Sequence, residues 1–464
     1  MEEKSSKNKI KMEKKEKIIV ALDVKTMNDA LTLVDLLKND VGYFKVGKEI
    51  LNAVGLPIVV GQLKALGAKV FVDIKESDIP NTVGEAVAAA TRAGADIINV
   101  HATGGLEMMQ AAVKKGKTAN PNVKIIAVSI LTSLSDKDMR EIGFVYPAKA
   151  MVYHLANLAK QAGMDGLVCS PQEVAGVREI MGPDALLITP GIRPQWDQKA
   201  GDQKRIATPM DAILNGASAM VIGRSITKNS QFSPVQAAEK IANEICQALA
   251  AQTAENGRTP KSIKDDFVNL LLEADVVKIK EEAFTLKAGG KSHMYVNARD
   301  LPANPNAFGT ALYHLRSLIE QKGISADRIA GVPMGGLSFA ANLSQQLGIP
   351  LLTLRDKPKD HGEVGKQTVE SFESGQSVLL FEDVATTGTS TLETIERLKE
   401  IGLNVSDVVV LVNRNSGAKK ALADKGIILH SVLRFDDIIN AVLRSESISE
   451  AIKQIVRDEI EFCN

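Results

Sequence analysis

A cluster of charged residues follows an apolar segment in the first half of the chain. The run 70–72 (VFV) leads into Asp73, Lys75 and Asp78, and Lys45 ends an earlier run of the same kind. Residues two apart in a strand point to the same face, so Asp73 and Lys75 should lie together, with Asp78 in the following loop. Burying such an array is costly unless the charges neutralise one another, and such arrays usually mark a functional site. A surface cluster of ion pairs is the alternative, which the apolar approach and the turn at 80–82 disfavour.

This array suits one kind of chemistry in particular. A lysine held charged between two carboxylates can donate a proton to a carbanion. A carboxylate placed against an anionic group of the substrate raises the energy of the ground state, and that repulsion is relieved as charge leaves. The sequence contains no flavin, pyridoxal or metal-binding motif that could act as an electron sink. We therefore predict a cofactor-free decarboxylation.

Two further segments could bind a phosphate group. Thr189-Pro-Gly-Ile-Arg193 ends the seventh predicted strand, and Ile222-Gly-Arg224 ends the eighth. Barrel enzymes often bind phosphate after these two strands through backbone amides. Gly191 and Gly223 permit close approach of the backbone, and Arg224 can hold phosphate oxygens bidentately.

A different constellation stands in the second half of the chain. The apolar run 377–381 delivers Glu382 and Asp383 to its end, and the turn 386–390 (TTGTS) then opens a helical stretch. Such a turn offers amides and hydroxyls to a phosphate at a helix N-terminus, while the two carboxylates can accept hydrogen bonds from a ribose diol. The GxxxxGK[ST] signature is absent, which disfavours an NTPase. A purely structural strand-turn-helix is the alternative.

These residues need strands and helices in regular alternation to bring them together. In the first half, eight short β-branched runs are each followed by a helical stretch, at 18–23, 43–47, 69–75, 96–102, 124–131, 166–170, 185–191 and 219–225. This order predicts a (β/α)8 TIM barrel, with an open doubly wound sheet as the alternative. The unusual polar residues favour the barrel, because they fall at the C-terminal ends of the runs, where barrel enzymes place their chemistry.

The second half predicts another α/β domain. Its strands are expected at 328–333, 350–355, 377–383, 405–413 and 427–433. The segment 251–264 is rich in small and polar residues and is interpreted as a linker. We therefore expect a polar arm over 1–17, the barrel over 18–250, the linker, and the second domain over 265–464.

Composition excludes several classes of protein. A chain of 464 residues is longer than one hydrophobic core usually supports. Lys plus Arg and Asp plus Glu both total 56, so the net charge is zero, which is unlike a general nucleic-acid binder. The three cysteines have neither disulfide-framework nor zinc-site spacing. With no apolar run of about 18 residues, no signal-peptide core and no peroxisomal ending, we expect a cytoplasmic protein without nucleic-acid or membrane partners. A membrane tether through the lysine-rich arm is the less favoured alternative.

The first half resembles the orotidine 5'-phosphate decarboxylase family. The motifs ALDV, FKVG, DIKESDIPNT, SILTS, TPGIRP and VIGRSIT occur in the order typical of that family, over nearly all of residues 16–250. The resemblance implies a catalytic tetrad of Lys45, Asp73, Lys75 and Asp78, with Lys75 as the proton donor and Asp78 contributed by the partner subunit of a dimer. It implies substrate contacts from Asp23, Thr82, Thr132, Ser133, Arg193, Gln203, Gly223 and Arg224. Glu76-Ser77 departs from the aromatic residue and histidine of many members, and His101 is interpreted as a hydrogen-bonded core residue outside the site.

The second half resembles orotate phosphoribosyltransferases over about residues 265–445. The resemblance rests on EDVATTGTS (382–390), FTLKAGGKSHMYVN (284–297) and RDKPKDHGE (355–363). It implies that Lys359 and His361 act in catalysis, and that the substrate is held by Lys291, Tyr295, Arg355, Glu382, Asp383, Thr386, Thr387, Gly388, Thr389, Ser390 and Arg414. Asp356 stands where many members have a lysine, and Met334-Gly335 stand where some have Tyr-Lys.

Together the resemblances imply a type I phosphoribosyltransferase domain fused behind the barrel, and two consecutive reactions. Orotate and phosphoribosyl diphosphate would give orotidine 5'-phosphate, which would lose CO2 to give UMP. Mg²⁺ is expected for the transferase, carried by the diphosphate rather than by protein ligands and possibly near Asp383, and no cofactor for the decarboxylase. A homodimer or higher homo-oligomer is expected. The alternatives are a barrel lyase acting on sugar phosphates or β-keto acids, and a phosphoribosyl diphosphate-sensing regulator.

Overall fold

The computed structural model describes residues 14–197, 207–253, 262–285, 291–355, 367–445 and 448–463. The chain divides into two compact units, Met1–Ser262 and Ile263–Asn464, here called the barrel unit and the second unit. None of the helices in the described part of the chain is long and apolar enough to cross a membrane.

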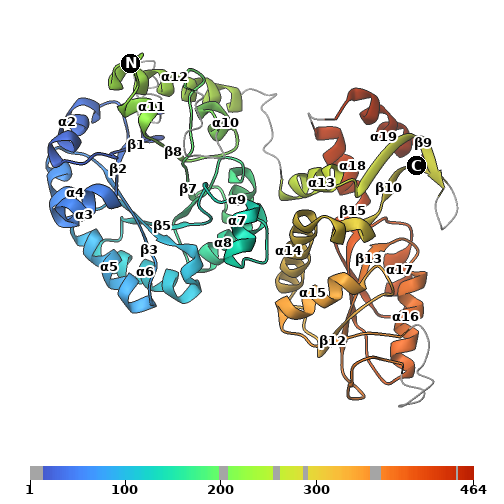
Figure 1. The fold of residues 1–464 in the computed structure, drawn as a ribbon. Helices are drawn as coiled ribbons and strands as arrows, with labels where there is room; N and C mark the ends of the chain where they lie inside the picture. The colour runs from blue at the N-terminus through green and yellow to red at the C-terminus, as the bar shows by residue number, and fades with distance from the viewer. Residues whose placement is uncertain are drawn as a thin grey trace. The chain divides into compact units, whose positions relative to one another are not determined.

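The barrel unit contains eight parallel strands that close on themselves in sequence order, β1 to β8 (Figure 1). The strands are β1 (Ile18–Ala21), β2 (Tyr43–Gly47), β3 (Val70–Glu76), β4 (Ile97–His101), β5 (Lys124–Val128), β6 (Gly166–Val168), β7 (Leu186–Thr189) and β8 (Ala219–Ile222). The predicted (β/α)8 barrel is thereby confirmed, and the open sheet is excluded.

Helices form a ring outside these strands (Figure 1). They are α2 (Met27–Leu37), α3 (Lys48–Val54), α4 (Leu56–Ala65), α5 (Pro80–Arg92), α6 (Leu106–Ala119), α7 (Asp136–Ile142), α8 (Ala148–Gln161), α9 (Val174–Met181), α10 (Pro209–Leu214), α11 (Arg224–Thr227) and α12 (Pro234–Thr253), with a 3-10 turn, η1 (Ala102–Gly104). Several begin with residues that favour a helix start. Ser135 and Thr208, for example, each accept a hydrogen bond from the backbone three residues on, at the starts of α7 and α10.

Apolar side chains fill the interior of the barrel. One buried layer consists of Ile19, Phe71, Ile97, Ile126, Ile188 and Ala219, contributed by six different strands. This layer fills the interior of the barrel with apolar side chains, as is usual for the fold.

The second unit is built on a five-stranded parallel sheet in the order β12-β11-β13-β14-β15. Its strands are β11 (Arg328–Gly331), β12 (Leu351–Leu352), β13 (Val378–Ala385), β14 (Asp407–Asn413) and β15 (Ile428–Arg434). All five were expected from the sequence. The helices are α13 (Ile263–Glu273), α14 (Pro305–Lys322), α15 (Leu337–Leu347), α16 (Thr389–Glu400), α17 (Ala418–Ala423), α18 (Phe435–Arg444) and α19 (Glu450–Cys463), with the 3-10 helix η2 (Ala298–Ala303).

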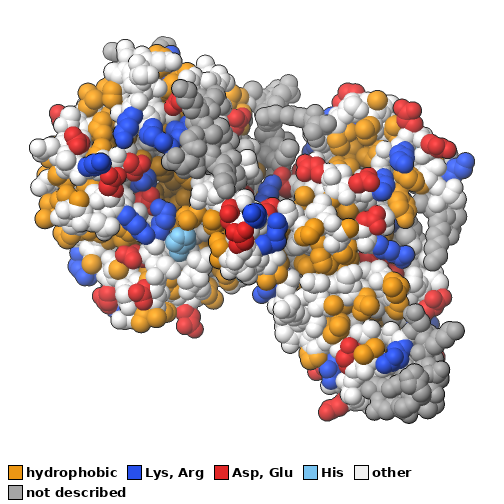
Figure 2. Space-filling model, in the orientation of Figure 1, with side chains coloured by type: hydrophobic (Ala, Val, Ile, Leu, Met, Phe, Trp, Pro, Cys, Tyr) orange, Lys and Arg blue, Asp and Glu red, His pale blue; other side chains and the backbone are white. Residues whose placement is uncertain are grey.

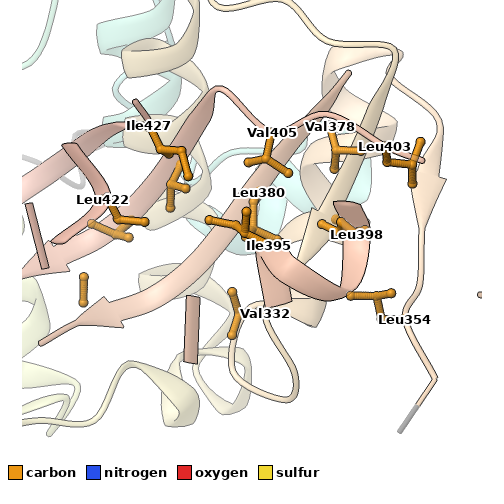
Figure 3. Close-up of a cluster of buried hydrophobic side chains, with 14 of the residues drawn as sticks. Val332, Leu354, Val378, Leu380, Ile395, Leu398, Leu403, Val405, Leu422 and Ile427 are labelled. Carbon is orange, nitrogen blue, oxygen red and sulfur yellow. The ribbon is translucent and has the colours of Figure 1, made fainter. Parts of the chain in front are cut away.

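A core on one side of this sheet fixes the position of α16. Ile395 and Leu398 of α16 pack with Leu380 of β13 in a buried cluster that also includes Val332 (Figure 3). The turn that joins β13 to α16 therefore has both of its ends anchored in the core.

Two features of the chain were not predicted. β9 (Val277–Thr285) and β10 (Lys291–Val296) form an antiparallel pair outside the main sheet. β9 was missed because its middle residues, Lys280 to Glu282, are polar and do not give an apolar run. In addition, α12 ends at Thr253 and α13 starts at Ile263, so both helices enter the segment assigned to the linker.

Two candidate active sites

The barrel holds a cavity of about 470 Å³ at the C-terminal ends of its strands. Acidic and basic side chains gather around a hollow in this unit (Figure 2). The charged residues that line the cavity are Asp23, Lys45, Glu49, Asp73, Lys75, Arg193, Arg224 and Lys228. The structure therefore brings most of the predicted decarboxylase residues into one space.

Asp73 lies between two lysines at the base of the cavity. Its Oδ2 is 3.0 Å from Nζ of Lys45, and its Oδ1 is 2.6 Å from Nζ of Lys75. Lys45 also lies 3.5 Å from Oδ1 of Asp23. Burial opposes ionisation of Asp73, but the two lysines and the hydrogen bonds outweigh it and lower the pKa of Asp73 to about 2. Burial acts against the charge of Lys45 as well, yet Asp73 and Asp23 raise its pKa. Three of the four predicted tetrad members thus form a charged chain.

The backbone at Lys75 departs from the regular strand that the sequence suggested. Lys75 has φ +54°, and the register between β3 and β4 shifts between Val72 and Glu76. Simple alternation along a strand therefore does not explain why Lys75 faces Asp73. The local bulge does, because it redirects the side chain. A positive φ is costly for a lysine and persists only where the surroundings hold it.

Asn99 supplies that support, although it was not among the predicted site residues. This residue of β4 is fully buried. Its Oδ1 accepts a hydrogen bond of 2.8 Å from the backbone N–H of Lys75, and its Nδ2 donates one of 2.7 Å to Oδ1 of Asp73. A lone amide in the apolar run 97–100 (IINV) was the available signal, because a buried amide needs partners.

His101, at the end of β4, does not match the hydrogen-bonded core residue that we expected. Its Nδ1 is buried and has no hydrogen-bond partner within the described ranges of the chain. Burial lowers the pKa of His101, and the nearby charges of Lys75 and Lys48 lower it further. Burial and the charge of Lys75 therefore both favour the neutral form of this imidazole.

Four predicted residues lie outside the cavity of their own chain. Asp78 and Thr82 are exposed, at the loop after β3 and the start of α5, and neither lines the cavity. Oδ1 of Asp78 instead accepts a hydrogen bond of 2.6 Å from the backbone of Ile79. Thr132 is buried and Ser133 is exposed in the loop after β5, and neither lines the cavity.

The residues predicted to bind the phosphate of the substrate lie at the opposite end of the cavity. Gly191, Arg193, Gly223 and Arg224 all line it, from the loops after β7 and β8. Arg193 is buried, and its Nη1 donates a hydrogen bond of 3.1 Å to Oγ of Ser225. Gln203 lies outside the described residues.

In the second unit, Glu382 and Asp383 come from the end of β13 and make contacts on different elements. The hydroxyl of Thr391, in α16, donates a hydrogen bond to Glu382. Nε of Arg299, in η2, lies 3.3 Å from Oδ2 of Asp383. Neighbouring residues of a strand point to opposite faces, which explains the divergence. Burial and the charge of Asp383 raise the pKa of Glu382 to about 7, against the hydrogen bond from Thr391.

The turn after β13 has the form of an anion site. Gly388 caps α16 with φ +82°, and the hydroxyls of Thr387 and Thr389 lie 3.0 Å apart. The carbonyl of Thr386 accepts a hydrogen bond of 3.0 Å from the backbone of Ala418, at the start of α17. Ser390 follows in the first turn of α16. The helix N-terminus and its hydroxyls are therefore held in place from two sides.

The remaining predicted transferase residues are distributed around this edge of the sheet. Tyr295 of β10 is partly exposed, with its ring 5.4 Å from that of Phe284. The guanidinium of Arg414 lies 3.3 Å from Oγ of Ser292, also in β10. Lys291 is exposed at the start of β10.

Arg355 is tied to the chain near the end of the sheet, where its Nε donates a hydrogen bond of 3.1 Å to the carbonyl of Thr368. Lys359 and His361 lie outside the described residues, as does Asp356.

Gly335, one of the two residues of the Met334-Gly335 departure, lies close to Asp383. A Cβ placed on Gly335 would lie 2.6 Å from the carboxyl carbon of Asp383, closer than real contacts allow. The backbone after β11 therefore packs directly against this carboxylate, and Met334 is 73% exposed.

The described residues contain no group of three or more His, Cys, Asp or Glu side chains placed to hold a metal ion. Oδ1 of Asp383 nevertheless has no hydrogen-bond partner among the described residues. Mg²⁺ prefers carboxylate and phosphate oxygens and usually binds through one or two carboxylates plus the phosphates of a substrate. The carboxylate of Asp383 therefore fits a magnesium ion that arrives with a diphosphate.

Comparisons with known proteins agree with this division. Residues 16–241 match the model of the orotidine 5'-phosphate decarboxylase / HUMPS family. The orotidine 5'-phosphate decarboxylase of Trichlorobacter lovleyi is 45% identical over 236 residues, which cover 50% of this chain and 96% of that protein. That of Moorella thermoacetica is 46% identical over 242 residues, which cover 51% of this chain and 94% of that protein. The chain belongs to the orotidine 5'-phosphate decarboxylase family.

The second unit matches a different family. Residues 303–441 match the model of the phosphoribosyl transferase domain.

Two solved structures are similar to parts or all of the chain. Orotidine 5'-phosphate decarboxylase from Lactobacillus acidophilus is 38% identical with a TM-score of 0.43, covering 49% of this chain and 98% of that one. Leishmania donovani UMP synthase is 20% identical with a TM-score of 0.41, covering 98% of both chains.

The two family matches confirm that a decarboxylase domain and a phosphoribosyltransferase domain are fused in this one chain. The expectation of an enzyme is confirmed with them, and the alternative of a regulator finds no support. The relatives named above are decarboxylases, which disfavours the alternative of a barrel acting on sugar phosphates.

Proposed function

We propose that this chain makes UMP from orotate in two consecutive steps. Its second unit would join orotate to phosphoribosyl diphosphate, with release of diphosphate. Its barrel unit would then remove CO2 from the orotidine 5'-phosphate formed. The observation that carries this proposal is the chain of Lys45, Asp73 and Lys75 in a cavity whose far end holds Arg193 and Arg224.

In the decarboxylation, the phosphate end of the cavity would hold the substrate while the charged chain acts on its pyrimidine. Asp73 is ionised at neutral pH, so it would repel the substrate carboxylate, and loss of CO2 relieves that repulsion. The C–C bond to CO2 breaks, its electron pair stays on C6, and the ammonium of Lys75 delivers a proton to C6. Asp23 and Lys45 would bind the ribose.

Four residues would complete this site from elsewhere. Asp78 and Thr82 would act in the cavity of a partner subunit, which suits their exposure and their distance from the cavity of their own chain. Thr132 and Ser133 would contact the pyrimidine from the loop after β5.

In the transfer, the turn after β13 would hold the 5-phosphate and the acids would hold the ribose hydroxyls. Tyr295, Arg414 and Thr386 would position orotate for attack on the ribose. Lys291, Arg355, Lys359 and His361 would bind the departing diphosphate, whose negative charge their donors stabilise. Mg²⁺ bound to the diphosphate, with Asp383 nearby, would neutralise part of the same charge.

We further propose that the protein works in the cytoplasm as a homodimer or a larger homo-oligomer. The exposure of Asp78, outside the cavity of its own chain, supports this, because the barrel site would lack this residue in a monomer.

A spectrophotometric assay tests the two activities separately. The full chain with orotate, phosphoribosyl diphosphate and Mg²⁺ should consume orotate and form UMP, and with orotidine 5'-phosphate alone it should form UMP without Mg²⁺. Lys75→Ala should abolish decarboxylation and let orotidine 5'-phosphate accumulate. Asp383→Asn combined with Glu382→Gln should abolish transfer and leave the decarboxylation of added orotidine 5'-phosphate intact. Folded wild-type protein with neither activity would refute the proposal.

A further inference from the structure

Arg299 is a charged residue that neither the sequence motifs nor the resemblance assigned to a site. It lies in η2, immediately after β10, and its Nε is 3.3 Å from Oδ2 of Asp383. Asp383 is almost completely buried, with 9% of its side chain exposed, whereas the side chain of Arg299 is 66% exposed. Because Arg299 is the exposed partner of this ion pair, its side chain is accessible to a ligand.

The guanidinium keeps most of its hydrogen-bonding capacity. An arginine has five N–H donors in a planar fork. Only the Nε of Arg299 has a partner within the described part of the chain, so both terminal amino groups are free there. A guanidinium fixed at one nitrogen and open at the other two is preorganised to bind two oxygens of a phosphate.

Its position separates it from the turn after β13. Glu382 faces Thr391 of α16, whereas Asp383 faces Arg299 of η2 and lies against the backbone of Gly335. An anion at the N-terminus of α16 therefore lies on the Glu382 side of β13, and an anion at Arg299 lies on the Asp383 side. A ribose that carries phosphate groups at two positions could place one on each side of the acid pair.

The base has a different cation available. Arg414 is hydrogen-bonded to Ser292 of β10, the strand that also carries Tyr295. The carboxylate of orotate would thus meet Arg414, which leaves Arg299 for the diphosphate.

We propose that Arg299 binds the diphosphate group of phosphoribosyl diphosphate while Asp383 holds its guanidinium in place. This rests on the proposed transferase function. Arg299 is therefore a substrate-binding residue, supplied by an element outside the main sheet.

The test compares Arg299→Gln and Arg299→Lys with the wild-type chain. Arg457→Gln is the matched control, because Arg457 of α19 makes an exposed ion pair with Glu450 at the same distance of 3.3 Å. The KM for phosphoribosyl diphosphate should rise about tenfold or more in Arg299→Gln, with a smaller rise in Arg299→Lys and none in the control. The kcat and the KM for orotate should change less than about threefold, and the melting temperature of the second unit should be unchanged.

Direct binding keeps this test independent of activity. Calorimetric titration with inorganic diphosphate and Mg²⁺ should show the same weakening in Arg299→Gln, while titration with ribose 5-phosphate should match wild type. Weakening confined to ribose 5-phosphate or orotate would overturn the diphosphate assignment. Equal loss for every ligand together with a lower melting temperature, or no loss at all, would also overturn it. Wild-type chain that binds diphosphate but transfers no phosphoribosyl group to orotate would refute the proposed function and leave this inference intact.

Discussion

The buried amide of Asn99 binds Asp73 through a hydrogen bond of 2.7 Å, donated by Nδ2 to Oδ1 of the carboxylate. Oδ1 of the same side chain accepts a hydrogen bond from the backbone N–H of Lys75. One residue of β4 thus sets both the carboxylate and the strained backbone of the lysine in β3. We therefore expect the geometry of the charged chain to depend on this amide.

Asn99→Ala should lower the kcat of decarboxylation by about tenfold to a hundredfold. The positive φ of Lys75 loses the acceptor that holds it, so its ammonium should no longer be fixed against Asp73. The KM should change little, because the phosphate end of the cavity is untouched. Steady-state decarboxylation kinetics measure this. Asn157→Ala on α8, whose Nδ2 binds the carbonyl of Tyr153, is the control. A kcat within twofold of wild type would show that Asn99 has no positioning role.

The stability of the barrel unit should depend on Asp73 only at acidic pH. The pKa of Asp73 falls from 3.8 to about 2 on folding, so its stabilisation is present above pH 3.8 and is lost as the pH falls through 2. The loss should be about 2 kcal/mol. Urea unfolding followed by the fluorescence of Trp196, the single tryptophan, reports on the barrel unit. Asp73→Asn should be less stable than wild type at pH 5 and close to it near pH 2. A constant difference across this range would contradict the prediction.

Glu382 should give the second unit the opposite pH dependence. The pKa of this acid rises from 4.5 to about 7 on folding, so the folded state binds more protons than the unfolded state between these values. Stability should therefore fall by up to about 3 kcal/mol as the pH rises from 4.5 to 7, and stay flat above 7. Hydrogen exchange of peptides covering β13 and α16 measures it. Glu382→Gln should remove the slope, and a slope that persists in this variant would assign the effect to another group.

Gly335→Ala should reduce transfer at least tenfold and leave decarboxylation unchanged. The added methyl group would meet the carboxylate of Asp383 at 2.6 Å, so either the backbone after β11 or the carboxylate must move. The two activities of the same preparation measure this directly. Gly61→Ala is the control, because a Cβ there meets nothing within 4 Å. Full transferase activity in Gly335→Ala would show that the contact with Asp383 is dispensable.

The sequence by itself was enough to predict the eight barrel strands, the five strands of the second sheet and the gathering of several charged residues in one cavity of the barrel. Runs of β-branched residues and the polar residues that end them are local signals, because strand periodicity and the place of chemistry at strand ends follow from backbone geometry. Asp73 and Lys75 were found in this way.

Only the tertiary structure decided how those residues meet. The roles of Asn99 and Arg299 depend on contacts with residues distant in sequence, such as Asp383 for Arg299, and no pattern within a short segment records such contacts. The bulge that turns Lys75 toward Asp73 arises from the pairing of β3 with β4. The partners of Glu382 and Asp383 depend on which element lies on each face of β13, α16 for the first and η2 for the second. Side-chain partners are set by packing between elements, so they become definite only when the elements are in place.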